Sequence, residues 1–168
     1  MKYPIIAVAT LLLFASFTFS PTQKNSINNT LTLTASTKTA VAGDEVCVDV
    51  TTRDFNQILS MQYTMKFNAK ALKFKKMTGF GLPGMTAQSF GQNNADKGII
   101  SYSWYDQNLR SVSVPDGTSI YQACFDVIGK SGEKAYLQFT GMPVAVEISN
   151  VDGGLLELNG VTGVVKIR

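Results

Sequence analysis

Apolar residues recur at every second position through most of this chain, and that alternation restricts what the chain can fold into. In 46–50, 59–67, 100–104 and 121–127, apolar side chains alternate with polar ones. A period of two is typical of a strand with one buried face, whereas an amphipathic helix requires spacings of three and four. Glycine, asparagine, aspartate and proline interrupt the alternating runs, as turn residues do between strands. The sequence therefore predicts an all-β fold.

The alternation predicts about nine strands and no helix. They are expected at 31–33, 46–50, 59–67, 72–77, 88–90, 100–104, 118–128, 137–139 and 161–167. Because each strand offers one apolar face, two sheets can cover each other, and a two-sheet β-sandwich with jelly-roll topology is the expected architecture. An ordinary immunoglobulin-like sandwich is the alternative. We expect one domain, at 30–168, since the length is too short for two well-buried cores.

The first 20 residues are typical of an export signal. Lys2 supplies a positive charge, and 4–19 is uncharged and mostly apolar. This stretch is too short for a comfortable transmembrane helix. We expect a signal peptide at 1–20, cleaved somewhere within 16–24, then a polar tether at 21–29, with an uncleaved anchor as the alternative. The mature protein would have no membrane span and would be extracellular or at the cell surface.

The residue types needed for common enzyme chemistry are missing or unpatterned. The chain has no histidine, so it lacks the commonest general base and transition-metal ligand. We expect solvated or turn-capping carboxylates at strand ends, namely Asp54, Asp106, Asp116, Glu133 and Glu147. The sequence predicts a protein that is not an enzyme and needs no cofactor.

Metal and nucleic-acid sites are not indicated either. Asn93, Asn94 and Asp96 cluster in one segment, but the spacing of a calcium-binding EF-hand loop is absent. We interpret the cluster as a turn and leave open whether a loop binds calcium. The net charge is only +3, without a run of basic residues, so nucleic acid is not an expected partner. Trp104 shares the apolar face of its strand with Ile100 and Tyr102, which places it in the core and not on a sugar-binding platform.

Four segments in order resemble a known family. The run Ala-Gly-Asp-Glu-Val-Cys-Val-Asp-Val at 42–50 resembles the opening of cohesin domains. Met-Gln-Tyr-Thr-Met-Lys-Phe-Asn at 61–68, with Ala-Leu-Lys-Phe at 71–74, resembles their third strand and the turn after it, although Asn68-Ala69 replaces the usual Asp-Pro. Pro-Asp-Gly-Thr at 115–118, leading into 124–127, resembles a later strand. The segments 78–84 and 103–106 look most like cohesin-type modules of Bacteroidetes.

The resemblance implies a nine-stranded jelly roll, related in fold to carbohydrate-binding modules. Its implied function is to hold a dockerin-like protein partner in an extracellular assembly linked to polysaccharide degradation. Fold alone does not decide function. A carbohydrate-binding module that binds polysaccharide, or a structural subunit of an extracellular matrix or filament, are the alternatives.

The resemblance also implies a disulfide and a binding face. Cohesins have the second and seventh strands side by side, which would bring Cys47 and Cys124 together as a disulfide in the oxidising compartment outside the cell. Two separate buried thiols are the alternative. The implied partner-binding residues point away from the core on the third, sixth and eighth strands: Gln62, Thr64, Lys66, Ser101, Ser103, Tyr105, Tyr136 and Gln138.

Overall fold

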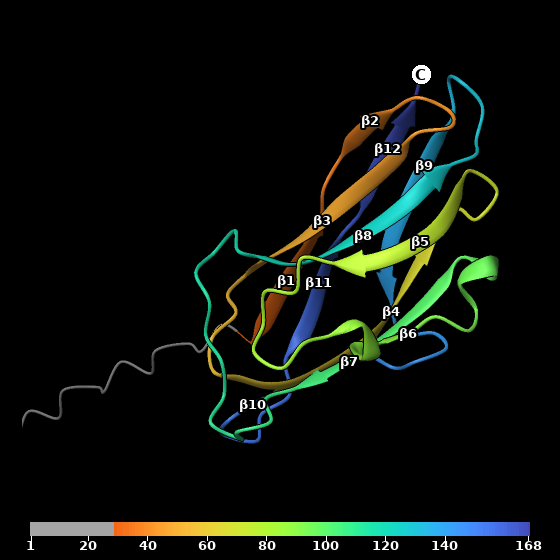
Figure 1. Ribbon diagram of the computed structural model, residues 1–168. Helices are drawn as coiled ribbons and strands as arrows, with labels where there is room; N and C mark the ends of the chain where they lie inside the picture. Colours follow the sequence, from red (N-terminus) through yellow and green to blue (C-terminus); the bar gives the residue numbers. More distant parts are fainter. Residues whose placement is uncertain (1–28) are drawn as a thin grey trace, which may run out of the picture.

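The computed structural model describes residues 29–168, which form two β-sheets packed face to face (Figure 1). The twelve strands of this part of the chain are β1 (Thr30–Ala35), β2 (Lys38–Ala40), β3 (Glu45–Arg53), β4 (Ile58–Phe67), β5 (Leu72–Thr78), β6 (Phe90–Gly91), β7 (Ile99–Tyr105), β8 (Ser119–Val127), β9 (Lys134–Thr140), β10 (Glu147–Asn150), β11 (Glu157–Val161) and β12 (Gly163–Ile167). Two single-turn 3-10 helices, η1 (Ala87–Ser89) and η2 (Ala95–Lys97), lie between β5 and β7. The predicted all-β sandwich is confirmed.

The expected signal peptide at 1–20, and the expected tether up to residue 28, lie outside the described residues. Within 29–168, no helix has the length and apolar character required to cross a membrane.

The order of strands joins segments that are far apart in the sequence. The first sheet has the order β11-β1-β3-β8-β5 and the second has β2-β12-β9-β4-β7-β6, with β10 paired to the first half of β4. Most neighbours are antiparallel, but β1 runs parallel to β11 and β2 runs parallel to β12. The earliest strands of the domain are therefore held in their sheets by strands near the C-terminus.

The alternation seen in the sequence separates core from surface. In β3, Val46, Val48 and Val50 are buried, and burial of each valine contributes about 2 kcal/mol to folding. Trp104 in β7 is also buried, and its indole N–H donates a 2.8 Å hydrogen bond to the Pro83 carbonyl. The prediction that Trp104 belongs to the core is confirmed.

The structure has more strands than the nine predicted, and the last predicted strand is divided between two strands. The additional strands β2, β10 and β11 have three to five residues each. Such lengths are too short for a period of two to stand out. The predicted strand at 161–167 divides at Thr162: Val161 ends β11 in the first sheet, and Gly163 begins β12 in the second. The predicted strand at 88–90 is mostly η1, with only Phe90 in β6.

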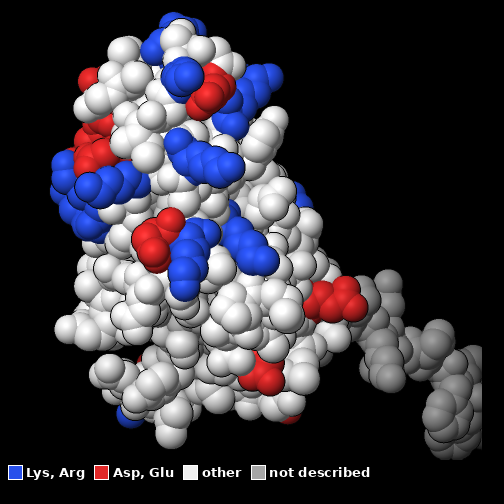
Figure 2. Space-filling view, turned by 90° about the vertical axis from the view of Figure 1, so that its right-hand side faces the viewer, with Lys and Arg blue, Asp and Glu red and all other residues white. Residues whose placement is uncertain are grey.

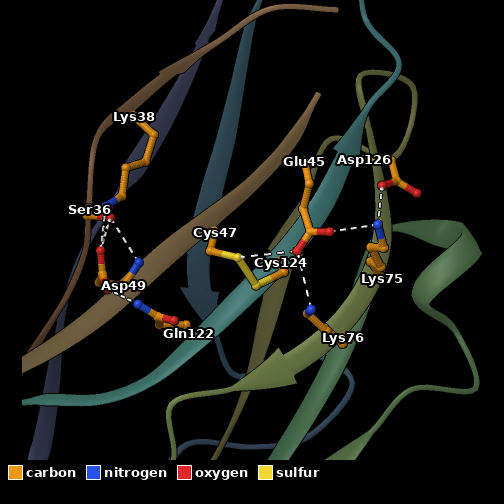
Figure 3. The surroundings of a disulfide bond; sticks show 10 residues. All are labelled: Ser36, Lys38, Glu45, Cys47, Asp49, Lys75, Lys76, Gln122, Cys124 and Asp126. Carbon is orange, nitrogen blue, oxygen red and sulfur yellow. Dashed lines mark hydrogen bonds and ion pairs between the residues drawn. A yellow bond between two sulfur atoms is a disulfide. The ribbon is translucent and has the colours of Figure 1, made fainter. Parts of the chain in front are cut away.

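Cys47 and Cys124 form the expected disulfide (Figure 3). The two residues are directly opposite each other on the neighbouring strands β3 and β8, with their Cα atoms 4.0 Å apart. Cys124 is fully buried and Cys47 is half-buried, so the bond is less exposed than a plain outer sheet face would leave it. The alternative of two separate thiols does not hold.

An ion cluster covers the disulfide. The Glu45 carboxylate lies 2.6 Å from Lys75 Nζ and 3.4 Å from Lys76 Nζ (Figure 3). The hydrogen bond from Lys75 holds the pKa of Glu45 below its usual value. Both lysines reach the same carboxylate because Lys75 is the extra residue of a β-bulge in β5. Glu45 also lies near both sulfurs, but these are joined to each other, so neither is available as a thiolate metal ligand.

Candidate functional site

The three strands expected to form a binding face are neighbours in the second sheet. β4 pairs with β7 on one side and with β9 on the other. Lys66 in β4 is opposite Gln138 in β9, and Gln62 in β4 is opposite Ser103 in β7. The structure thus brings the predicted residues to one outer sheet face, in the order that alternation and strand pairing require.

One predicted residue on this face is covered. Thr64 points away from the core, as expected, but its side chain is fully buried. Its hydroxyl donates to the Val144 carbonyl and accepts from the Val144 amide, at 3.2 and 3.0 Å. The segment 141–146, which links β9 to β10, therefore lies across β4 at this point. Thr64 is removed from the predicted contact residues, because no partner can reach it while this segment is in place.

The covering segment divides the face into two parts, which we name after their exposed tyrosines. The Tyr105 patch consists of Ser60, Gln62, Ser103, Tyr105 and Glu147. The Tyr136 patch consists of Lys66, Lys134, Tyr136, Gln138 and Lys166. Ser101, also predicted as a contact, is opposite Thr64 and half-buried between the two patches.

The Tyr105 patch is rich in hydroxyl and amide groups. Tyr105 is 57% exposed, and hollows of about 200 and 190 Å³ lie on either side of it. Gln62 Nε2 donates a 2.9 Å hydrogen bond to Glu147, which fixes both side chains beside one of the hollows. An exposed aromatic ring between two hollows, surrounded by oriented polar groups, is suited to insertion into a protein partner.

The Tyr136 patch has the opposite electrostatic character. Tyr136 is 49% exposed, and a hollow of about 280 Å³ beside it is lined by Lys66, Phe67, Asn68, Tyr136 and Gln138. Lys134 and Lys166 are directly opposite each other on β9 and β12. The three lysines make this half of the face cationic, whereas the Tyr105 patch carries one carboxylate.

The carboxylates expected at turns cap backbone groups. Asp106 is buried, and its two oxygens accept from the amides of Asn108 and Arg110 at 3.1 and 2.9 Å. Asp116 accepts from the Asp54 amide at 2.9 Å, and Glu133 accepts from the Lys130 amide. Glu147 differs, since it bonds Gln62 within the Tyr105 patch.

The outer face of the first sheet has its own polar cluster. Asp49 accepts from Lys38 Nζ at 2.5 Å and from Gln122 Nε2 at 2.6 Å (Figure 3). These two hydrogen bonds, with that of Lys38 the stronger, hold the pKa of Asp49 below its usual value. The cluster joins β2, β3 and β8, so its role is to connect strands.

One apolar hollow was not anticipated from the sequence. It has a volume of about 320 Å³ and lies where β5 meets η2, lined by Ala69, Leu72, Lys73, Phe74, Ala95, Asp96 and Ile128. A signal was present, because Val127 and Ile128 are consecutive apolar residues at the end of a strand and only one of them can face the core. Ile128 is 53% exposed.

Neither a protein-family model nor a curated protein matches the sequence. Solved structures do match the fold. A cohesin of Clostridium thermocellum, solved in the Coh-OlpA–Doc918 cohesin–dockerin complex, is 17% identical, with a TM-score of 0.68 over 83% of this chain and 100% of that one. CaCohA2 of Clostridium acetobutylicum is 19% identical, with a TM-score of 0.67 over 84% of this chain and 92% of that one. A non-cellulosomal cohesin of the archaeon Archaeoglobus fulgidus is 19% identical, with a TM-score of 0.64 over 83% and 91%. At these identities the likeness establishes the fold.

Proposed function

We propose that this chain, which has the fold of cohesin domains, is a non-catalytic module that binds a dockerin-like protein partner. The observation that carries the proposal is that several structures with this fold hold dockerins, including cohesins of Clostridium thermocellum and Acetivibrio cellulolyticus. Fold likeness at this identity is compatible with other functions. The proposal therefore also has to rest on a surface suited to a protein partner.

The Tyr105 patch is the centre of the proposed contact. Its tyrosine combines an apolar ring with a hydroxyl group, and tyrosines of this kind often carry much of the binding energy at protein interfaces. Gln62 on the neighbouring strand β4, and Ser103 on the same strand as Tyr105, supply hydrogen-bonding groups at the rim. Lys66, Tyr136 and Gln138 extend the contact for a partner that reaches past the segment 141–146.

We further propose that the module acts outside the cell, in an assembly linked to polysaccharide degradation. The apolar segment 4–19 supports export, and the Cys47–Cys124 disulfide is of the kind that persists in oxidising compartments. The absence of histidine from the sequence supports a role in holding and not in catalysis. The link to polysaccharides rests on the resemblance to cohesins.

The test is a binding screen with residues 30–168 immobilised. Purified dockerin modules and the secreted proteins of the source organism are passed over the wild-type domain and over a Tyr105→Ala variant. We expect retention of a protein with a dockerin-like module by the wild type, and at least tenfold weaker retention by the variant. An Ile128→Ala variant, altered at an exposed residue next to the first sheet, should bind as the wild type does. If no dockerin-like protein is retained, the proposal is wrong.

A further inference from the structure

Positive charge is distributed unevenly over this domain. On the face drawn in Figure 2, Lys and Arg gather in the upper half, with few in the lower half. Part of this charge is neutralised locally, as in the Glu45 cluster over the disulfide. The positive charge on the outer face of the second sheet is not neutralised in this way. The three lysines of the Tyr136 patch, Lys66, Lys134 and Lys166, have no Asp or Glu on their own strands.

The strand register places these lysines around one tyrosine. Lys134 lies two residues before Tyr136 on β9, and so on the same face. Tyr136 is opposite Val164 on β12, which makes Lys166 its diagonal neighbour on that side. Lys66 is opposite Gln138, which makes it the diagonal neighbour of Tyr136 on β4. Side chains at such positions are within reach of one another.

The charge of the three lysines is not balanced within the described residues. The ion pairs of residues 29–168 engage other cations, namely Lys38, Arg53, Lys75 and Lys76. Lys134 and Lys166 also face each other directly, an arrangement that opposes folding. Glu133, which precedes Lys134 in the sequence, accepts from the Lys130 amide, and Glu147 is bonded to Gln62 on the far side of the segment 141–146. An unbalanced cationic group on a rigid sheet is suited to an anionic ligand.

The groups beside the lysines indicate which anion. The hollow of about 280 Å³ is lined by the half-exposed ring of Tyr136, the amides of Asn68 and Gln138, and Lys66. A ring offers a flat apolar surface, and amides both donate to and accept from hydroxyl groups. The centre of a protein interface is depleted in charged residues, whereas three lysines surround the Tyr136 ring. A nucleic-acid strand would call for several stacking rings.

We propose that the Tyr136 patch binds an acidic polysaccharide, with the Tyr136 ring against a sugar face and the three lysines against its carboxylate or sulfate groups. This inference goes beyond the proposed protein-binding role and does not depend on it. The segment 141–146 separates the two patches, so a protein partner whose contact is confined to the Tyr105 patch leaves the Tyr136 patch open. The module would then hold a protein partner and a charged glycan on one sheet face.

The experiment is affinity electrophoresis of residues 30–168 in gels containing alginate, polygalacturonate or dextran sulfate, with neutral dextran as the comparison. We expect retardation in at least one of the acidic gels and none in dextran. The two uronate gels and the sulfate gel distinguish the two sources of negative charge. The variant Lys66→Gln/Lys134→Gln/Lys166→Gln should bind at least tenfold more weakly, and so should Tyr136→Ala, which leaves the charge unchanged.

A matched variant tests whether position matters or only charge. Arg53→Gln/Lys73→Gln/Arg110→Gln removes the same charge from exposed side chains on β3, β5 and the loop between β7 and β8, away from the patch, and it should be retarded nearly as much as the wild type. If both triple variants lose retardation equally, the binding is general charge attraction and the proposal is overturned. Wild-type mobility unchanged in all acidic gels, or full binding by Tyr136→Ala, would overturn it too. The triple substitution of the patch lysines could also weaken the binding of a protein partner and leave polysaccharide binding unchanged. In that case the patch belongs to the protein contact, and the polysaccharide proposal is wrong while the dockerin-type function stands.

Discussion

The hydroxyl groups of Tyr63 and Tyr121 share a 2.7 Å hydrogen bond in the centre of the sandwich. Tyr63 belongs to β4 in the second sheet and Tyr121 to β8 in the first, so the bond joins the two layers. Both side chains are fully buried, and burial raises the pKa of each hydroxyl above its usual value. The ring of Tyr102 stacks on Tyr121 with centroids 5.7 Å apart, but its hydroxyl has no partner among the described residues.

This arrangement predicts opposite results for two similar substitutions. Tyr63→Phe leaves the buried Tyr121 hydroxyl without its partner and should lower the free energy of unfolding by about 2 kcal/mol. Tyr102→Phe removes a hydroxyl that has no partner and should leave the free energy of unfolding unchanged or higher. Urea denaturation of both variants and the wild type measures the difference. An equal loss in both would mean that the Tyr63–Tyr121 bond adds nothing.

The disulfide should account for a large share of the stability. Replacing Cys47 and Cys124 together with alanine releases a link between residues 77 positions apart. The chain-entropy model gives a loss of up to about 4 kcal/mol in the free energy of unfolding. Calorimetry of the double variant measures the loss. Mass spectrometry of unreduced tryptic peptides should first find the two cysteines linked, and two free thiols in exported protein would contradict the structure.

The Asp49 cluster should make stability depend on acid pH. Its hydrogen bonds from Lys38 and Gln122 lower the pKa of Asp49 in the folded state. A lowered pKa means that the stabilisation is complete above the ordinary aspartate pKa of about 4 and is lost as the pH falls through the folded value. Asp49→Asn should therefore lower the free energy of unfolding by about 1 kcal/mol at pH 7, and the two proteins should converge in acid. Asp152→Asn, at an exposed turn carboxylate, serves as the control.

The two exposed tyrosines of the second sheet should separate two contacts. If one partner covers the whole face, Tyr105→Ala with Tyr136→Ala should weaken protein binding by about 2 kcal/mol or more, while thermal stability changes little. If the protein contact is confined to the Tyr105 patch, Tyr136→Ala alone should leave protein binding intact. Titration calorimetry with the captured partner measures each variant. Full binding by the double variant would show that this face is not the site.

Alternation was sufficient to predict the buried faces of the long strands. The resemblance to cohesins predicted that β4, β7 and β9 lie side by side. Val46, Val48, Val50 and Trp104 are in the core as expected. The sequence could not reveal that Thr64 is covered, because the bond to Val144 joins residues 80 positions apart in a segment without periodicity. Nor could it place the lysines around Tyr136, since β12 was expected to begin at Val161 and its register with β9 was unknown.

The parallel pairs β1–β11 and β2–β12 determine when the domain can finish folding. Thr30 pairs with Glu157, and Lys38 pairs with Val165, so the first strands to leave the ribosome wait for some of the last. Contacts between residues this distant close slowly, because a long loop must be ordered before they form. The domain therefore stays incomplete during synthesis until residue 167 has emerged. Until then, β1 and β2 lack the parallel partners that hold them in their sheets.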